Sequence, residues 1–432
     1  MKNKNKFRIA LVLVMIMPLF AHAENWWEDN LDPVNWTATW ATANKTITFF
    51  DPPLADINNA TLRQVVRISE AGRMVRVSLT NEFGTTPLNI NEAHVALRDT
   101  GSAIVDSSGN QLTFSGSNSV SILPGARVVS DAVDMDVPDN AELVISAYLP
   151  DDVTGSGSPV TYHVRALQTN YIAAGNQAAD TDLESATTTT AWHFLASVDV
   201  ANYWAMPVIA TLGDSITDGD QLGAPNEPID TNVRYPDLLS EAIIAGGKAA
   251  SVINLGISGN QVLTSFLGEN PAARLSRDVL TQTGVTHVIY LEGINDIGLP
   301  VLLSVLGIPT PVNSAEAIIA GYKQVISRAK AAGLSVIGGT LTPSGGSALP
   351  GYNDATAEAK RQTINAWIRD SGAYDAVIDF DAALADSENP AAMSADLTAD
   401  GLHPNAAGYQ VMADTAFAVI GGRLPPKRYE GN

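Results

Sequence analysis

The spacing of apolar residues changes near residue 205, and this change limits the possible folds more than any other feature. Beyond it, short apolar runs such as residues 208–212 and 285–291 alternate with helical segments such as residues 236–245. Strands that alternate with helices form a parallel sheet that is covered by helices on both faces. We therefore predict that residues 205–420 form a three-layer α/β domain.

Residues 24–204 show a different pattern, in which apolar and polar residues alternate over short stretches. In residues 74–80, Val75, Val77 and Leu79 lie on one side of a predicted strand and the polar residues lie on the other. Stretches rich in Gly, Ser, Asn and Pro separate such runs and are typical of turns. We predict an all-β sandwich or jelly-roll domain here, so the 432 residues contain two domains.

The two ends of the chain are predicted to lie outside these domains. Basic residues precede the apolar run 9–20, and a small-x-small cleavage site ends at Ala23. Because the run is shorter than the roughly 20 residues that span a bilayer, we expect no stable membrane insertion. We predict that residues 1–23 are a cleaved signal peptide and that the mature protein is periplasmic or extracellular. Residues 421–432 are predicted to form a surface tail.

Composition and missing motifs exclude several classes of function. The chain has no cysteine, which excludes disulfides, thiolate metal sites and a cysteine nucleophile. Its formal net charge of −21 opposes binding to nucleic acid and to anionic membranes. It contains no phosphate-binding loop, no dinucleotide-binding glycine motif and no Gly-x-Ser-x-Gly nucleophile motif. The sequence carries no signal for an oligomeric state.

Four polar segments lie at the edge where the predicted strands of the α/β domain end. Residues 213–219, 254–260 and 292–296 follow the first three strands, and residues 400–405 precede the last helix. Parallel sheets bind their ligands beyond the carboxyl ends of the strands. Taken together, the four segments predict an active site at this edge of the sheet.

The residues in these segments can supply the parts of a serine ester hydrolase. We predict that Ser215 is the nucleophile, that His403 is its general base, and that Asp400 orients and stabilises the imidazole. The predicted oxyanion donors are the Ser215 N–H, the Gly256 N–H and the side-chain amide of Asn295. Glycine at position 256 would allow the backbone to come close to a ligand.

Other polar and aromatic residues are interpreted as structural. Asp214 and Asp218 are expected to hydrogen-bond within their loop, and Asp296 is expected to brace the loop after the third strand. Four scattered histidines are given the same role: His94, His163, His193 and His287. For the tryptophans near the predicted mature start, packing is favoured over stacking on sugars. They are Trp26, Trp27, Trp36 and Trp40.

The set of four segments resembles the SGNH hydrolase superfamily, also called GDSL esterases and lipases. Four residues occupy the positions that define it: Ser215, Gly256, Asn295 and His403. Asp400 would be the triad acid, and the first block reads Gly-Asp-Ser-Ile. The resemblance covers about residues 205–420. It implies a flavodoxin-like sheet, hydrolysis of O-acyl esters, and no metal or other cofactor.

Finer features resemble a secreted, xylan-esterase-like branch of this superfamily. They are the segments 36–43, near the predicted mature start, and 274–280, before the third block. That branch places a β-domain before the hydrolase domain. Together with the predicted export, the resemblance implies that the substrate carries short acyl groups, such as acetyl on polysaccharide.

The sequence leaves three alternatives open. The protein could instead be a short-chain lipase or aryl esterase, or an acyltransferase that forms the same acyl-enzyme. It could also be a glycan-binding protein whose hydrolase domain is vestigial. The complete set of four segments disfavours this last alternative, because a vestigial site is free to lose any of them.

Overall fold

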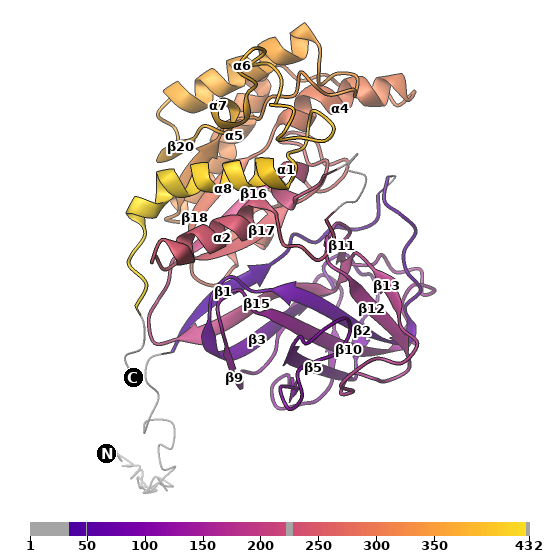
Figure 1. Cartoon of the computed structure of the whole chain (residues 1–432). Helices are drawn as coiled ribbons and strands as arrows, with labels where there is room; N and C mark the ends of the chain where they lie inside the picture. Colours follow the sequence, from indigo (N-terminus) through magenta and orange to yellow (C-terminus); the bar gives the residue numbers. More distant parts are fainter. Residues whose placement is uncertain (1–33, 49, 222–227, 429–432) are drawn as a thin grey trace, which may run out of the picture.

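The computed structural model describes residues 34–48, 50–221 and 228–428. Within them, a β-rich unit packs against an α/β unit that follows it in the chain, as Figure 1 shows. The fold class predicted from the sequence is confirmed. The predicted signal peptide, residues 1–23, lies outside the described residues and stays a prediction. None of the described helices is long and apolar enough to cross a membrane.

The β-rich unit contains two large antiparallel sheets that enclose one apolar core within the described residues. The predicted alternation in β3 is confirmed, because Val75, Val77 and Leu79 are buried in that core. The first sheet contains β1 (Asn35–Ala41), β15 (Leu195–Asn202), β3 (Gly72–Thr80), β8 (Arg127–Val129) and β9 (Val133–Val137). The second contains β13 (Thr187–Thr189), β12 (Asn170–Ala174), β2 (Asn58–Arg67), β10 (Glu142–Asp152), β5 (Glu92–Leu97) and β6 (Asn110–Gln111). Two short pairs complete the unit: β4 (Leu88–Ile90) with β7 (Val120–Ile122), and β11 (Tyr162–His163) with β14 (Trp192–His193).

Two of the tryptophans near the predicted mature start pack against other side chains. Trp40 is buried and meets Trp192 edge-on, with ring centroids 4.9 Å apart. The Arg76 guanidinium covers the ring of Trp36 at 4.3 Å. The packing role favoured from the sequence is therefore confirmed for these two, whereas Trp26 and Trp27 lie outside the described residues.

A parallel sheet forms the centre of the α/β unit, in the strand order β17–β16–β18–β19–β20. The strands are β16 (Val208–Gly213), β17 (Ser251–Gly256), β18 (Val285–Leu291), β19 (Ser335–Gly339) and β20 (Ala376–Ile378). This is the flavodoxin-like order, in which the first strand lies between the second and the third. The order therefore reverses at β16, and the crevice beyond its carboxyl end is the expected ligand site.

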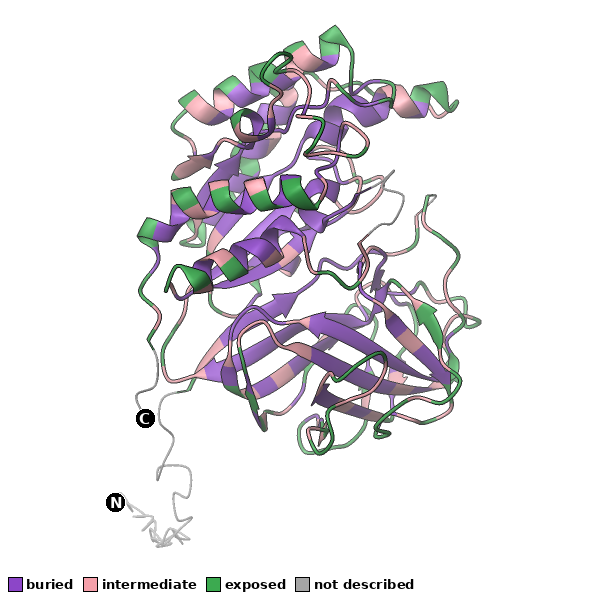
Figure 2. Ribbon diagram, in the orientation of Figure 1, coloured by how far each residue is buried: buried purple, intermediate pink, exposed green. Residues whose placement is uncertain are grey.

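Helices cover both faces of this sheet. α2 and α8 pack together over one face and α5 and α6 over the other, and Figure 2 shows their outer sides exposed. Two predicted N-caps are confirmed, since Ser314 accepts the Ala317 N–H and Asn405 accepts the Gly408 N–H. The α-helices are α1 (Ser215–Asp218), α2 (Tyr235–Ala245), α3 (Pro271–Arg274), α4 (Ile294–Val305), α5 (Ala315–Ala331), α6 (Ala355–Asp370), α7 (Phe380–Leu384) and α8 (Ala406–Ile420). A π-helical turn, η1 (Leu275–Leu280), follows α3, and a 3₁₀ turn, η2 (Gly421–Arg423), follows α8.

The two units are joined by buried hydrogen bonds along β1. The Ala38 N–H donates to the Thr283 carbonyl at 3.0 Å, and the Ser251 hydroxyl donates to the Ala38 carbonyl at 2.5 Å. The Ser251 hydroxyl also meets that of Ser69 at 2.7 Å. Because buried polar groups are costly to leave unpaired, these bonds hold the two units in one arrangement.

The segment that was predicted to be a surface tail is mostly exposed in its described part, but it is also tied to both units. Leu424 is buried in the core of the α/β unit. The Lys427 ammonium then forms ion pairs with Glu70 at 2.7 Å and with Asp139 at 2.6 Å, both in the β-rich unit. The described part of the tail, residues 421–428, therefore ties the end of the chain back to the first unit.

Candidate active site

Ser215 begins a single helical turn, α1, directly after β16. Its neighbour Asp214 is the N-cap of this turn and accepts the Ile216 N–H at 3.1 Å. A side chain on Gly213 would come within 2.4 Å of the Leu291 carbonyl oxygen, so the strand must end in glycine here. The backbone thus turns sharply at the carboxyl end of the central strand and brings the Ser215 hydroxyl into the crevice.

The structure brings Ser215, His403 and Asp400 together in the order predicted for a catalytic triad. His403 Nε2 lies 3.0 Å from Ser215 Oγ, although the two residues are 188 positions apart. His403 Nδ1 lies 2.7 Å from Asp400 Oδ2. The imidazole can therefore accept the hydroxyl proton at one nitrogen while the carboxylate fixes its tautomer at the other.

A tight loop before α8 sets the carboxylate against the imidazole. Asp400 Oδ1 accepts the backbone N–H groups of Leu402 at 2.9 Å and His403 at 2.7 Å. Gly401 has a φ of +75°, and a side chain there would meet the Gly346 backbone at 2.2 Å. One oxygen of Asp400 thus shapes the loop, which leaves the other free to hold the imidazole.

The charge of Asp400 favours the protonated form of His403. Burial opposes the charged form of His403, but the hydrogen bond and the charge of Asp400 outweigh it and raise the pKa above 6.5. Burial also disfavours the charge on Asp400, yet the bonds from His403 hold the pKa of Asp400 below its usual value. The pair therefore stabilises the imidazolium that forms when the hydroxyl loses its proton.

The structure corrects the predicted glycine donor of the oxyanion hole. The Gly256 N–H donates to the side chain of Asn254 at 2.9 Å, so it is not available to a ligand. Position 256 is glycine for packing, because a side chain would lie 2.4 Å from the Asp218 backbone nitrogen. Gly259 lines the cavity around Ser215, and its N–H has no partner among the described residues. The sequence signal was present, since Gly-Ile-Ser-Gly offers two glycines three positions apart.

Asn295, the other predicted oxyanion donor, is held rigidly at the start of α4. Its side-chain oxygen accepts the Tyr352 hydroxyl at 2.8 Å, and its amide nitrogen donates to the Asn260 carbonyl at 3.0 Å. The amide nitrogen carries two protons, so one remains for a ligand in the cavity that Asn295 lines.

The two aspartates predicted to support the site lie where that role requires. Asp214 caps α1, and burial raises its pKa to about 7. Asp296 accepts the N–H groups of Val262 at 2.7 Å and Leu263 at 3.1 Å, and burial raises its pKa to about 6. Asp296 therefore connects the start of α4 to the loop after β17.

Sequence reasoning gave no role to Arg274, which holds the edge of the sheet together. This fully buried side chain donates to the carbonyls of Gly213 at 3.0 Å and Leu255 at 2.7 Å, and to the side chain of Asn260 at 3.0 Å. Those carbonyls end β16 and β17, so one guanidinium fixes the spacing of two site loops. The only sequence signal was its place in the segment 274–280.

The β-rich unit reaches the loop that carries Ser215. His163 Nε2 lies 3.0 Å from Asp218 Oδ1, and both side chains are buried. Arg165 Nε donates to Asp220 Oδ1 at 2.8 Å. His163, interpreted from the sequence as structural, therefore forms a contact between the two units beside the nucleophile.

Both units line the cavity that opens at Ser215, which has a volume of about 330 Å³. Its polar residues, apart from those already described, are Lys45, Asp51 and Ser258. Most of its wall is apolar: Phe50, Pro52, Val164, Leu267, Leu299, Leu302, Leu306, Leu349 and Leu402. The site therefore combines a serine–histidine–aspartate triad with a largely apolar wall.

Comparison with known proteins finds one family match. Residues 211–411, a little less than half of the chain, match the GDSL-like lipase/acylhydrolase family. No curated protein matches this chain.

Several solved structures resemble the chain over about half its length. They include an acetyl xylan esterase, at 21% identity over 49% of this chain and 98% of that chain, with a TM-score of 0.36. An aryl esterase of M. smegmatis is 17% identical over 49% of this chain and 96% of that chain, with a TM-score of 0.38. A GDSL-like lipase of Bacteroides thetaiotaomicron is 20% identical over 50% of this chain and 87% of that chain, with a TM-score of 0.36.

Proposed function

We propose that the protein is a carboxylic ester hydrolase of the GDSL-like lipase/acylhydrolase family, whose model residues 211–411 match, and that it works through an acyl-enzyme on Ser215. The observation that carries this proposal is the 3.0 Å contact between Ser215 Oγ and His403 Nε2, with Asp400 behind the imidazole. A serine hydroxyl needs such an adjacent base to become a nucleophile.

The proposed reaction has two halves with His403 in reversed roles. In the first, Ser215 Oγ bonds to the ester carbonyl carbon as its proton passes to His403 Nε2. The tetrahedral intermediate then collapses, and the alcohol leaves with the proton from the imidazolium. In the second half, His403 takes a proton from water, which attacks the acyl-enzyme. The acid leaves and the proton returns to Ser215 Oγ.

The oxyanion is proposed to bind three donors: the Ser215 N–H, the Gly259 N–H and the second amide proton of Asn295. Gly259 replaces Gly256 in this role. We expect Asn295→Ala to lower kcat by about 10²–10³, because one preorganised donor is lost where negative charge develops. KM should change little, since the ground-state carbonyl needs that donor less. Steady-state kinetics on a soluble nitrophenyl ester measures both constants.

The matched control for that variant is Tyr352→Phe. It removes the hydroxyl that holds the Asn295 oxygen but leaves the amide donor in place. We expect a kcat loss well below that of Asn295→Ala. Equal losses in the two variants would mean that Asn295 only supports the loop.

The cavity wall favours an acyl group larger than acetyl. Leu299, Leu302 and Leu306 lie three and four positions apart, on one face of α4 and its end, and they all line the cavity. Phe50 and Leu349 line the same cavity. Phe50 is 47% exposed, Leu349 is 37% exposed and Leu306 is 55% exposed. An acetyl group would leave most of this surface in water. We therefore propose esters with a longer apolar acyl chain as the preferred substrates, and acetyl on carbohydrate as the second candidate.

A panel of nitrophenyl esters from acetate to decanoate tests both the activity and this preference. We expect kcat/KM to rise at least about tenfold from acetate to hexanoate, because each buried methylene contributes up to about 0.8 kcal/mol. Acetylated xylan should be a poorer substrate than the hexanoyl ester. Activity that is highest on acetate and on acetylated xylan would reverse the order of the two candidates. The absence of hydrolysis across the whole panel would contradict the proposed function.

A further inference from the structure

A second, larger cavity lies between the two units at the opposite edge of the parallel sheet. Its volume is about 630 Å³, within the range of small-molecule sites. Met206 and Ala249, which precede β16 and β17, line it, so it borders the amino ends of these strands. Strand β16 runs from there to the catalytic edge, a length of about 17 Å. None of the residues that line the catalytic cavity lines this one.

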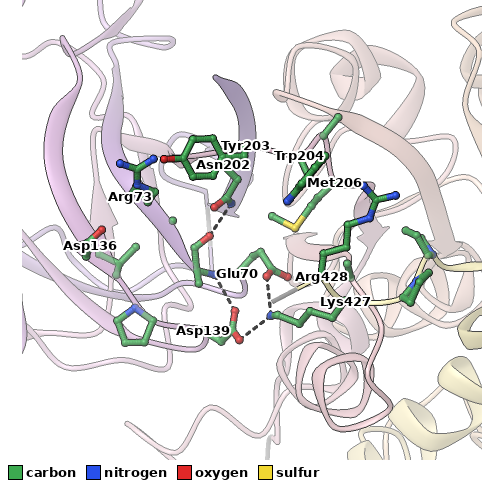
Figure 3. A pocket seen from close by; sticks show the side chains of 18 residues that line it. Glu70, Arg73, Asp136, Asp139, Asn202, Tyr203, Trp204, Met206, Lys427 and Arg428 are labelled. Carbon is green, nitrogen blue, oxygen red and sulfur yellow. Dashed lines mark hydrogen bonds and ion pairs between the residues drawn. The ribbon is translucent and has the colours of Figure 1, made fainter. Parts of the chain in front are cut away.

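One side of this cavity is aromatic. Trp204 is 52% exposed, whereas every other tryptophan in the described part of the chain is buried or half-buried. The Arg428 guanidinium lies over its ring at 4.6 Å, and the Arg73 guanidinium lies over the ring of Tyr203 at 4.5 Å. Figure 3 shows Tyr203 and Trp204 next to each other, with Arg73 beside Tyr203 and Arg428 beside Trp204. A large ring left in water at the wall of a concave site is typical of a ligand contact.

The floor of the cavity is rigid and polar. Lys427 pairs with Glu70 and Asp139, as the dashed lines in Figure 3 show. Asp139 also accepts the Ala71 N–H at 2.9 Å, and the Asn202 amide donates to the Ala71 carbonyl at 2.8 Å. Because these groups hold one another, the cavity is formed before a ligand arrives, and little ordering cost remains.

The charges around the cavity balance, although the chain as a whole carries −21. Three acidic residues line it, namely Glu70, Asp136 and Asp139, and three basic ones, namely Arg73, Lys427 and Arg428. Among the described residues, no carboxylate pairs with either arginine, so their N–H donors remain available to a ligand. A site with balanced charge, free donors and carboxylate acceptors selects a neutral ligand with many hydroxyl groups.

We propose that this cavity binds a neutral oligosaccharide. An apolar sugar face packs on the open part of Trp204, and the ring hydroxyls bond to Arg73, Asp136 and Arg428. The site is independent of the proposed catalytic chemistry, because it lies at the other edge of the sheet. Its effect is to hold the protein on a glycan while the catalytic edge faces away.

Calorimetric titration of the full-length protein with unesterified oligosaccharides of xylose, glucose and mannose tests this proposal. Oligogalacturonate serves as the anionic comparison. We expect at least one neutral oligosaccharide to bind with a Kd of about 1 mM or tighter, and to bind more tightly than oligogalacturonate. If none of the neutral oligosaccharides binds at a concentration of about 10 mM, ten times the expected Kd, the proposal is overturned. Tighter binding of oligogalacturonate than of every neutral oligosaccharide also overturns it.

Trp204→Ala locates the binding. We expect this variant to raise the Kd of the neutral oligosaccharide at least about 10-fold, because truncation of a central aromatic contact has an effect of this size. The matched control is Leu123→Ala, which truncates a side chain that is 61% exposed elsewhere in the β-rich unit and should leave affinity unchanged. Unchanged affinity in Trp204→Ala overturns the proposal. The rate at which Trp204→Ala hydrolyses a small nitrophenyl ester should stay within about twofold of the wild-type rate. Failure of the glycan site and failure of the proposed ester hydrolysis therefore give different results.

Discussion

Ser215→Ala should lower kcat for ester hydrolysis by at least about 10⁴-fold, because no other group replaces the bond between serine and the acyl carbon. The side chain is only 5% exposed and is small, so the variant should stay folded. Its stability should fall by only about 1 kcal/mol, through loss of the hydrogen bond to His403. Single-turnover and steady-state kinetics on a nitrophenyl ester, with circular dichroism to monitor folding, provide the measurement.

Ser117→Ala is the matched control for this variant. It makes the same chemical change at an exposed position in a β-rich loop, and it should keep full activity. If the folded Ser215→Ala variant hydrolyses esters at a rate near that of the wild type, Ser215 is not the nucleophile and the acyl-enzyme route is wrong.

Asp400→Asn should cost about 10⁴-fold in kcat, because an amide cannot hold the imidazole tautomer that the base requires. The loop should survive, since the asparagine oxygen can still accept the N–H groups of Leu402 and His403. The variant therefore isolates the charge of Asp400 from its structural role. Asp414→Asn, on an exposed position of α8, is the matched control and should stay active.

The same variant should change the pH dependence of kcat/KM. Only neutral His403 can act as base, so activity is lost as the pH falls through its pKa. In the wild type, the hydrogen bond and the charge of Asp400 outweigh burial and raise that pKa, so the acid limb should lie above the ordinary pKa of histidine. Without the carboxylate, burial is opposed only by the charges of Asp220 and Asp214, so the pKa of His403 should fall and the limb should move to lower pH. A wild-type profile that is flat from pH 4 to 9, or a limb that the variant leaves in place, would contradict the assignment of His403.

The sequence predicted the features that depend on local patterns. Period-two alternation identified β3, and Ser314 and Asn405 marked the starts of α5 and α8. The meeting of Ser215 with His403 also followed from a local rule, since both lie in loops at the carboxyl edge of a parallel sheet. Such a rule places segments at the same edge without any knowledge of the contacts between side chains.

The features that were missed depend on contacts that leave no local signal. The choice between Gly256 and Gly259 rests on one hydrogen bond, from the Gly256 N–H to Asn254. Helix α4 was not predicted, because Pro300 lies inside it and proline normally ends a helix. The ion pair that ties the tail to the β-rich unit was missed because Glu70 lies 357 positions away from Lys427.

The contacts of the β-rich unit beside Ser215 limit how far the enzyme can be shortened. Asp218 and Asp220 are each at most 2% exposed, and their partners His163 and Arg165 belong to the other unit. A minimal enzyme that starts at residue 205 would keep both carboxylates but lose their two hydrogen-bond partners, so the loop that carries Ser215 would lose two of the contacts that hold it in place. Engineers who want a smaller catalyst should therefore redesign these two aspartates at the same time as they remove the first unit.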